Sequence, residues 1–168
     1  MSLFLIHSVH AASSSGEFIL QPSTSKLQSG QKFAVDVLVD SGSTPIKAVE
    51  AHILYPDTLI VGGINLFDTA FDIQTENKAS NGIVRLARGA VIPVSGIQKI
   101  ATISFSGIGS PTDLRFSPDS VIIRSSDNKN IYTESQNYYA DQSVNTTQNT
   151  PPVQVTLTEQ NSKKDRGV

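Results

Sequence analysis

Apolar and polar residues alternate with a period of two through most of the chain between Phe18 and about Tyr132. Turn-forming Gly, Ser, Asn, Asp and Pro residues interrupt this alternation every several residues. Strands that are half buried between two layers have this pattern, and no window has apolar residues at helical spacing over a useful length. The clearest alternating segments are 32–40 (KFAVDVLVD), 48–55 (AVEAHILY) and 99–107 (KIATISFSG).

These segments also predict which side chains face the core. In the first, the inward residues are Phe33, Val35, Val37 and Val39; in the second, Val49, Ala51, Ile53 and Tyr55; in the third, Ala101, Ile103 and Phe105. Many short strands separated by turns predict an all-β sandwich, of which the jelly roll is one variant. Further strands are expected in EFILQ (17–21), TLIVGGI (58–64), FDIQTE (71–76), GIVRLARGA (82–90), DLRFS (113–117), SVIIRS (120–125) and NIYTE (130–134).

The two ends of the chain differ from this middle part. A length of 168 residues favours one domain. Residues 1–11 (MSLFLIHSVHA) are typical of the back half of a secretory signal, with an N-terminal tail as the alternative. The segment 137–168 is rich in Gln, Asn, Thr and Ser, which predicts a polar linker or tail. We therefore expect a β-sandwich over residues 17–136 with a disordered tail at each end.

Composition excludes several classes of function. The net charge of −2 gives no basic surface for nucleic acid, and the absence of cysteine excludes disulfides and thiolate chemistry. No segment contains the roughly 18 consecutive apolar residues that a membrane-spanning helix needs.

The sequence contains no catalytic motif. Its histidines are His7, His10 and His52, of which only His52 lies in the predicted sandwich, so a site built from several histidines is excluded there. No G-x-S-x-G elbow accompanies His52, which favours a surface residue over a catalytic base. The segment SSDNKN (125–130) has some likeness to a calcium loop but lacks its ligand order, which favours a hairpin turn. We expect no catalysis, no cofactor and no metal on this chain.

Four segments together resemble a cohesin domain. They are GQKFAVDVLVDSGSTPIKAVEAHILYPDTLIV (30–61), NGIVRLARGA (81–90), SGIQKIATISFSG (95–107) and SVIIRSSDNKNI (120–131). Their order and spacing are similar to those of the family over residues 17–136. One departure is visible: the family usually has Tyr-Asp-Pro after the third strand, whereas here Tyr55 is followed by Pro56 and then Asp57.

The resemblance implies a nine-stranded jelly-roll sandwich that binds a dockerin module through one sheet face. The family's calcium belongs to the dockerin and not to the cohesin. A cohesin-like role also implies a secreted or cell-surface bacterial protein that anchors enzymes or surface proteins on a scaffold. Any contact with polysaccharide would then be made by the parent protein.

The resemblance further predicts the residues of the binding face. Arginine is enriched in interface hot spots, so we expect Arg85 to contribute most, with a solvated arginine covering apolar neighbours as the alternative. An ordinary solvated sheet face is likewise the alternative for the whole set. The predicted partner-binding residues are Ala48, Glu50, His52, Gln74, Glu76, Arg85 and Ala87.

Two other functions stay open on the sequence. Sandwiches of this superfamily include carbohydrate-binding modules, which commonly stack sugars on rows of exposed aromatic rings. Here tryptophan is absent, and Phe33, Tyr55 and Phe105 lie in the inward phase. The other alternative is a structural cell-surface sandwich without a dockerin partner.

Overall fold

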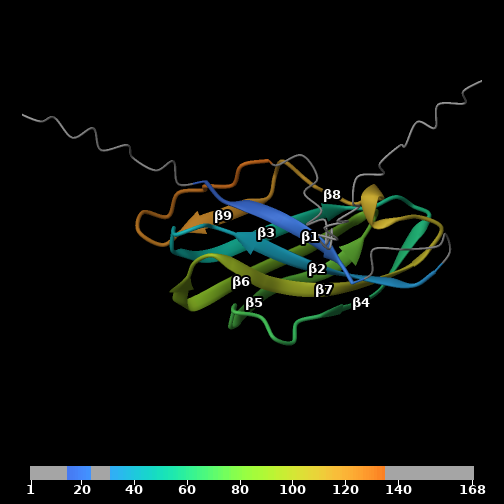
Figure 1. Ribbon diagram of the computed structural model, residues 1–168, viewed down its shortest axis with the longest axis horizontal. Coiled ribbons are helices and arrows are strands. Elements are labelled where there is room, and N and C mark those ends of the chain that lie inside the picture. Colours follow the sequence, from blue (N-terminus) through green and yellow to red (C-terminus); the bar gives the residue numbers. More distant parts are fainter. Residues whose placement is uncertain (1–14, 24–30, 135–168) are drawn as a thin grey trace, which may run out of the picture.

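A computed structural model describes residues 15–23 and 31–134 (Figure 1). The expected signal remnant at 1–11 and the expected tail at 137–168 lie outside these residues. Within them the chain forms nine β-strands and one short 3₁₀ helix, η1. The strands are β1 (Glu17–Pro22), β2 (Phe33–Asp40), β3 (Ile46–Leu54), β4 (Leu59–Asn65), β5 (Ile73–Ser80), β6 (Ile83–Val94), β7 (Ile97–Gly107), β8 (Arg115–Phe116) and β9 (Val121–Arg124); η1 spans Pro111–Asp113.

The strands form two antiparallel sheets that stack face to face (Figure 1). One sheet has the order β1-β2-β7-β4, and the other has the order β5-β6-β3-β8, with β9 also paired to β3. The chain changes sheet at most of its connections, for example from β2 to β3, from β3 to β4 and from β6 to β7. The predicted all-β sandwich with nine strands is confirmed.

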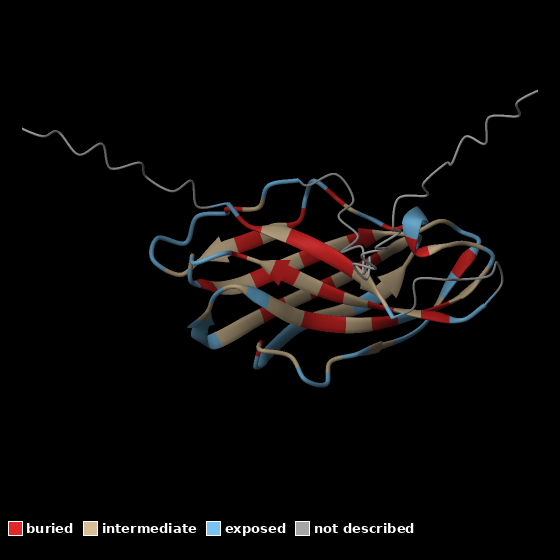
Figure 2. Ribbon diagram, viewed as in Figure 1, coloured by how far each residue is buried: buried red, intermediate tan, exposed pale blue. Residues whose placement is uncertain are grey.

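The core lies between the two sheets and follows the predicted alternation. Along β2, Val35, Val37 and Val39 are fully buried, and the residues between them are half-buried. Figure 2 shows the resulting alternation of buried and less buried positions along the strands. Burying one such side chain contributes about 1.5–3 kcal/mol relative to leaving it exposed. The inward phases predicted for β3 and β7 are also confirmed, with Tyr55 packed at the edge of the core.

Two of the predicted strand segments form little or no regular strand. In 113–117, strand structure is limited to Arg115–Phe116, because η1 precedes it. Ser110 caps η1 in a capping box with Asp113, and Pro111 occupies a first-turn position, which favours a helical turn. In 130–134, Asn130 and Tyr132 form isolated bridges to Ile123 and Gly16 and make no continuous ladder.

Candidate functional site

Six of the seven predicted binding residues lie on the outer face of the five-stranded sheet. Antiparallel partners project from the same side of a sheet. Ala87 on β6 is in register with Glu50 on β3 and with Glu76 on β5, while Arg85 is opposite His52. The inward neighbours on β3 and β6, which are Val49, Ala51, Ile53, Val84 and Leu86, are all buried. We call this surface the β5-β6-β3 face; its predicted residues are Ala48, Glu50, His52, Glu76, Arg85 and Ala87.

Gln74 is the predicted residue that the structure does not bring to this face. It is in register with Arg88, whose side chain is buried, whereas Glu76 is in register with Ala87. The register shifts between Gln74 and Glu76 because a β-bulge adds one residue to β5. Gln74 is exposed at the sheet edge, on the side opposite to that of Glu76.

The hairpin between β5 and β6 sets the register of the face. Asn81 and Gly82 form its two-residue turn, and both have positive φ, of 53° and 74°, as a type I′ turn requires. A side chain at Gly82 would bring its Cβ to 3.1 Å from the Tyr55 carbonyl oxygen, so glycine also fits this position sterically. Counting back from the turn, Ser80 pairs with Ile83 and Lys78 with Arg85.

Lys78 is therefore a residue of this face that was not among the predicted ones. It is exposed, and its neighbours Asn77 and Ala79 are less exposed and point the other way. The Asn-Gly dipeptide is the signal that would have found it, because a two-residue hairpin fixes every pair up to the bulge.

Glu50 and His52 form a side-chain hydrogen bond along β3. Glu50 Oε1 lies 2.9 Å from His52 Nε2, and the side chains are 44% and 12% exposed. The backbone N–H of His52 donates to Ser120 Oγ at 3.1 Å, so this serine contacts the main chain of His52. The pair holds the imidazole against the sheet and leaves the carboxylate near the surface.

Small residues occupy one end of the face. Ala48 on β3 is opposite Gly89 on β6, and the flanking strands contribute Ile73 on β5 and Ile123 on β9. A Cβ built on Gly89 would lie 3.4 Å from the Ile73 Cβ, an ordinary packing distance. The two middle residues of this row have little or no side chain, and the two outer residues are isoleucines.

Arg88 has a structural position beneath the face. Its side chain is buried, and it donates a hydrogen bond to the backbone carbonyl of Phe71 in the β4–β5 connection. Burial lowers the pKa of Arg88, and the carboxylate of Asp72 opposes that effect. The guanidinium therefore ties β6 to the start of β5.

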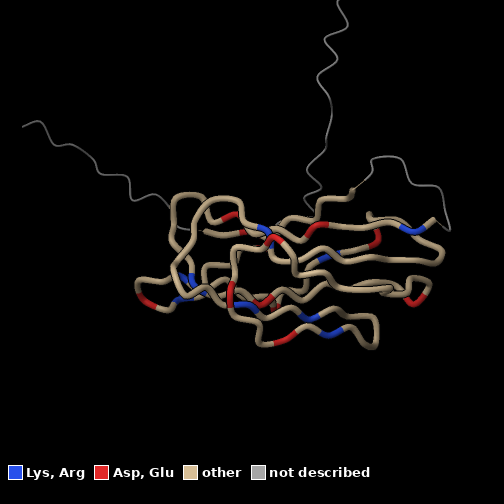
Figure 3. Tube along the Cα trace, turned by 90° about the horizontal axis from the view of Figure 1, so that it is seen from below, with Lys and Arg blue, Asp and Glu red and all other residues tan. Residues whose placement is uncertain are grey.

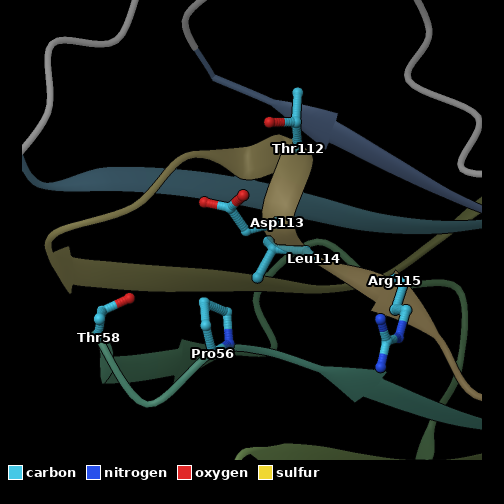
Figure 4. Close-up of a pocket in the computed structure, with 6 residues that line it drawn as sticks. All are labelled: Pro56, Thr58, Thr112, Asp113, Leu114 and Arg115. Carbon is cyan, nitrogen blue, oxygen red and sulfur yellow. The ribbon is translucent and has the colours of Figure 1, made fainter.

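An open hollow of about 460 Å³ lies at one end of the sandwich (Figure 4). Pro56 and Thr58 line one side, and residues 112–115 of η1 and β8 line the other. Its carboxylate, Asp113, accepts a hydrogen bond from the Ser110 N–H at 2.7 Å and so serves as part of the helix cap. The hollow contains no arrangement of groups that indicates a catalytic role.

The remaining chemistry-bearing groups are dispersed. In the part of the chain that the structure describes, acidic and basic positions are scattered along the backbone (Figure 3). The described residues contain no group of three or more His, Cys, Asp or Glu side chains that could hold a metal ion. Segment 125–130 forms a turn in which Arg124 binds the Asp127 carboxylate through Nε at 2.8 Å and Nη2 at 2.7 Å. The hairpin turn predicted there is confirmed.

Aromatic rings lie mostly in the core. Phe33 and Phe105 stack with ring centroids 5.3 Å apart, and Tyr55 meets Phe105 edge-on at 6.0 Å. In the part of the chain that the structure describes, Phe67 is the one aromatic residue that is exposed, at 80%. A single ring does not make a row for sugar stacking.

The described residues do not include a helix long and apolar enough to cross a membrane.

The β5-β6-β3 face lies on the outside of a two-sheet antiparallel sandwich. No protein-family model and no curated protein matches the sequence. Solved structures do match. The chain is similar to the CaCohA2 cohesin from Clostridium acetobutylicum, at a TM-score of 0.58 and 18% identity over 74% of this chain and 88% of that one.

Two other similar structures give the same result. The cohesin module of a family 33 glycoside hydrolase from Clostridium perfringens matches at a TM-score of 0.58 and 15% identity, over 72% of this chain and 91% of that one. A type I cohesin–dockerin complex from Clostridium thermocellum matches at a TM-score of 0.56 and 10% identity, over 76% and 95%. The chain has the cohesin fold, and the resemblance seen in its sequence is confirmed at the level of fold.

Proposed function

We propose that this chain is a non-catalytic interaction module that binds a dockerin-type partner through the β5-β6-β3 face. One observation carries the proposal: the strand register gathers predicted contact residues from three separate segments onto one outward surface. Solved structures of the same fold include complexes with dockerins, which supports this class of partner.

The dimensions of the face suit one helix of the partner. Strands β5, β6, β3 and β9 span about 14 Å between the outer strand axes at a spacing of about 4.8 Å, and a helix with side chains is about 10–12 Å across. The small side chains of Ala48, Ala87 and Gly89 lie along the middle strands, where they allow a close approach. A stable interface needs about 800 Å² from each partner, which a flat face supplies more readily than separate loops.

Three further parts belong to the same proposal. Calcium, where binding requires it, is held by the partner and not by this chain. The protein is secreted or exposed on a bacterial surface, and it anchors enzymes or surface proteins there. Fractionation of the producing cells, with an antibody against this chain, tests the location: recovery in the cytoplasm alone would contradict it.

A bulky charge in the middle of the face tests the binding site. Ala48→Arg should lower the affinity for a calcium-loaded dockerin at least about 100-fold, because the new side chain covers the small-residue row and leaves a charge against the partner. Isothermal titration against a panel of purified dockerins would measure this loss. The folded state should persist, since Ala48 points away from the core.

Ala34→Arg is the matched control. Ala34 lies on β2, opposite Ser104, on the outer face of the other sheet. This variant should bind within about twofold of the parent. If Ala48→Arg binds as well as Ala34→Arg does, the β5-β6-β3 face is not the binding surface.

A further inference from the structure

Three basic side chains share one cross-strand row of the β5-β6-β3 face. Lys78 on β5 is opposite Arg85 on β6, and Arg85 is opposite His52 on β3. We call these three residues the basic row. Among the described residues, His52 has a hydrogen-bonded carboxylate partner in Glu50, and neither Lys78 nor Arg85 has an ion-pair partner.

This arrangement opposes folding. Like charges directly opposite each other on neighbouring strands are destabilising. Glu76 precedes Lys78 by two positions on the same face, but its carboxylate forms no salt bridge with Lys78 or Arg85 in the structure. An anionic group placed over Lys78 and Arg85 would relieve the repulsion. A guanidinium beside an ammonium group suits a carboxylate, which accepts hydrogen bonds from both.

The other end of the same face has the opposite character. The row of Ile73, Gly89, Ala48 and Ile123 carries no charge, and we call it the apolar row. It is separated from the basic row by the intervening row of Glu76, Ala87 and Glu50. Gly89 and Arg85 are four positions apart on β6, which corresponds to about 13 Å along the strand.

A partner helix can contact both rows at once. Positions i and i+7 or i+8 share a helix face and are about 10–12 Å apart at a rise of 1.5 Å per residue. A helix that runs along the strands would therefore place an apolar side chain over the low middle of the apolar row and a carboxylate over the basic row. Reversing the helix would place the carboxylate among isoleucines, at a cost in desolvation.

We propose that the partner presents an aspartate or glutamate to the row Lys78–Arg85–His52 and an apolar side chain to the row Ile73–Gly89–Ala48–Ile123, and so binds in one orientation. This inference rests on the proposed function, because it assigns the partner's chemistry at the same face. According to this inference, the basic row determines which partner binds. The repulsion within the row is then the cost of recognising an acidic side chain.

A selection experiment tests the inference. A dockerin library with the exposed positions of its helices randomised is displayed on yeast and selected against the parent chain and against Lys78→Glu/Arg85→Glu. The parent should enrich Asp or Glu at least about tenfold at one helix position, and the reversed variant should enrich Lys or Arg there. The apolar preference seven or eight positions away should be the same with both.

The control bait is Lys32→Glu/Lys129→Glu, which makes the same change in net charge outside the face. It should select the same helix residues as the parent does. If the reversed variant also selects the parent's residues, the basic row does not read the partner's charge and the inference is wrong, although the proposed function stands. If no bait selects any dockerin, the proposed function fails and the inference fails with it.

A stability measurement tests the repulsion without a partner. Lys78→Glu replaces a like-charge pair with an opposite-charge pair, so its thermal midpoint should rise by about 1–5 °C at low salt. Its affinity for an Asp- or Glu-bearing dockerin from the selection should fall at least about tenfold. Lys32→Glu should alter neither value. An unchanged midpoint or an unchanged affinity for Lys78→Glu would overturn the inference.

Discussion

The outer faces of the two sheets have the same alternation of polar residues, but the cross-strand charge pair at the centre of each face differs. On the four-stranded sheet, Asp36 accepts a hydrogen bond from Thr102 Oγ1 at 2.5 Å and lies 3.3 Å from Lys99 Nζ. On the five-stranded sheet, Lys78 is opposite Arg85, and no ion pair to either lies within the described residues.

This difference separates two uses of a polar sheet face. The four-stranded sheet also has like charges opposite each other, Glu17 and Asp40, but its Asp36–Lys99 pair is complete within the chain. Charges that have no partner within the chain, such as those of Lys78 and Arg85, can form favourable ion pairs with a second molecule. The alternation itself, seen in the sequence, is the same in both cases.

The largest expected effect is the loss of stability caused by a substitution at Leu86 on β6. Leu86 is fully buried, whereas its neighbours Arg85 and Ala87 face outward. Leu86→Ala should lower the free energy of unfolding by about 2–5 kcal/mol, because it leaves a cavity between the sheets. Urea denaturation would measure the loss. A loss below about 1 kcal/mol would contradict the assignment of Leu86 to the core.

Replacing one charged side chain on each face by alanine compares the contributions of the two faces to dockerin affinity. Arg85→Ala should weaken binding of a dockerin by about 1–3 kcal/mol if the guanidinium is an interface hot spot. Lys99→Ala, on the four-stranded sheet, should leave the affinity unchanged within about 0.5 kcal/mol. Equal effects on the affinity would remove the distinction between the two faces.

Asp36→Ala should affect stability and not binding. Its carboxylate accepts the Thr102 hydrogen bond and pairs with Lys99. Loss of these contacts should cost about 0.5–1.5 kcal/mol in the free energy of unfolding. Calorimetry of the variant, together with titration of a dockerin, separates the two quantities. A weakened affinity without a change in stability would show that this face also takes part in binding.

The smallest effect concerns a charge pair that lies off both faces. Hydrogen bonds from Arg124 lower the pKa of Asp127 to about 2. Because the folded-state pKa lies below the ordinary value near 4, this pair stabilises the fold above about pH 4, and the contribution is lost as pH falls through about 2. Asp127→Asn should therefore flatten the dependence of the thermal midpoint on pH between about 2 and 4. An unchanged profile would contradict the assignment.

Part of the face follows from local sequence. The alternation along β3 and β6 predicted that Glu50, His52 and Arg85 point away from the core, and the structure confirms their outward phase. The pairing of Lys78 with Arg85 could also be predicted, because the two-residue turn at Asn81–Gly82 determines which residues of the two strands are opposite each other.

Other parts did not follow from local sequence. The position of Gln74 depends on a bulge in β5, and the row of Ile73, Gly89, Ala48 and Ile123 comes from four strands, of which β9 is far along the chain from β3. A bulge has no single sequence motif, so the resemblance to the family placed Gln74 on the same face as Glu76.

Side-chain phase is a property of one strand: successive residues point to opposite sides, so the segments 33–40, 48–55 and 99–107 reveal it before any pairing is known. Which side chains become neighbours is a property of pairs of strands. It depends on register and on which sheet each strand joins, and these are settled by packing of Val49, Leu86 and the rest of the core across both sheets. For this reason the polar face could be recognised from the sequence, whereas its division into a basic row and an apolar row emerged from the folded arrangement.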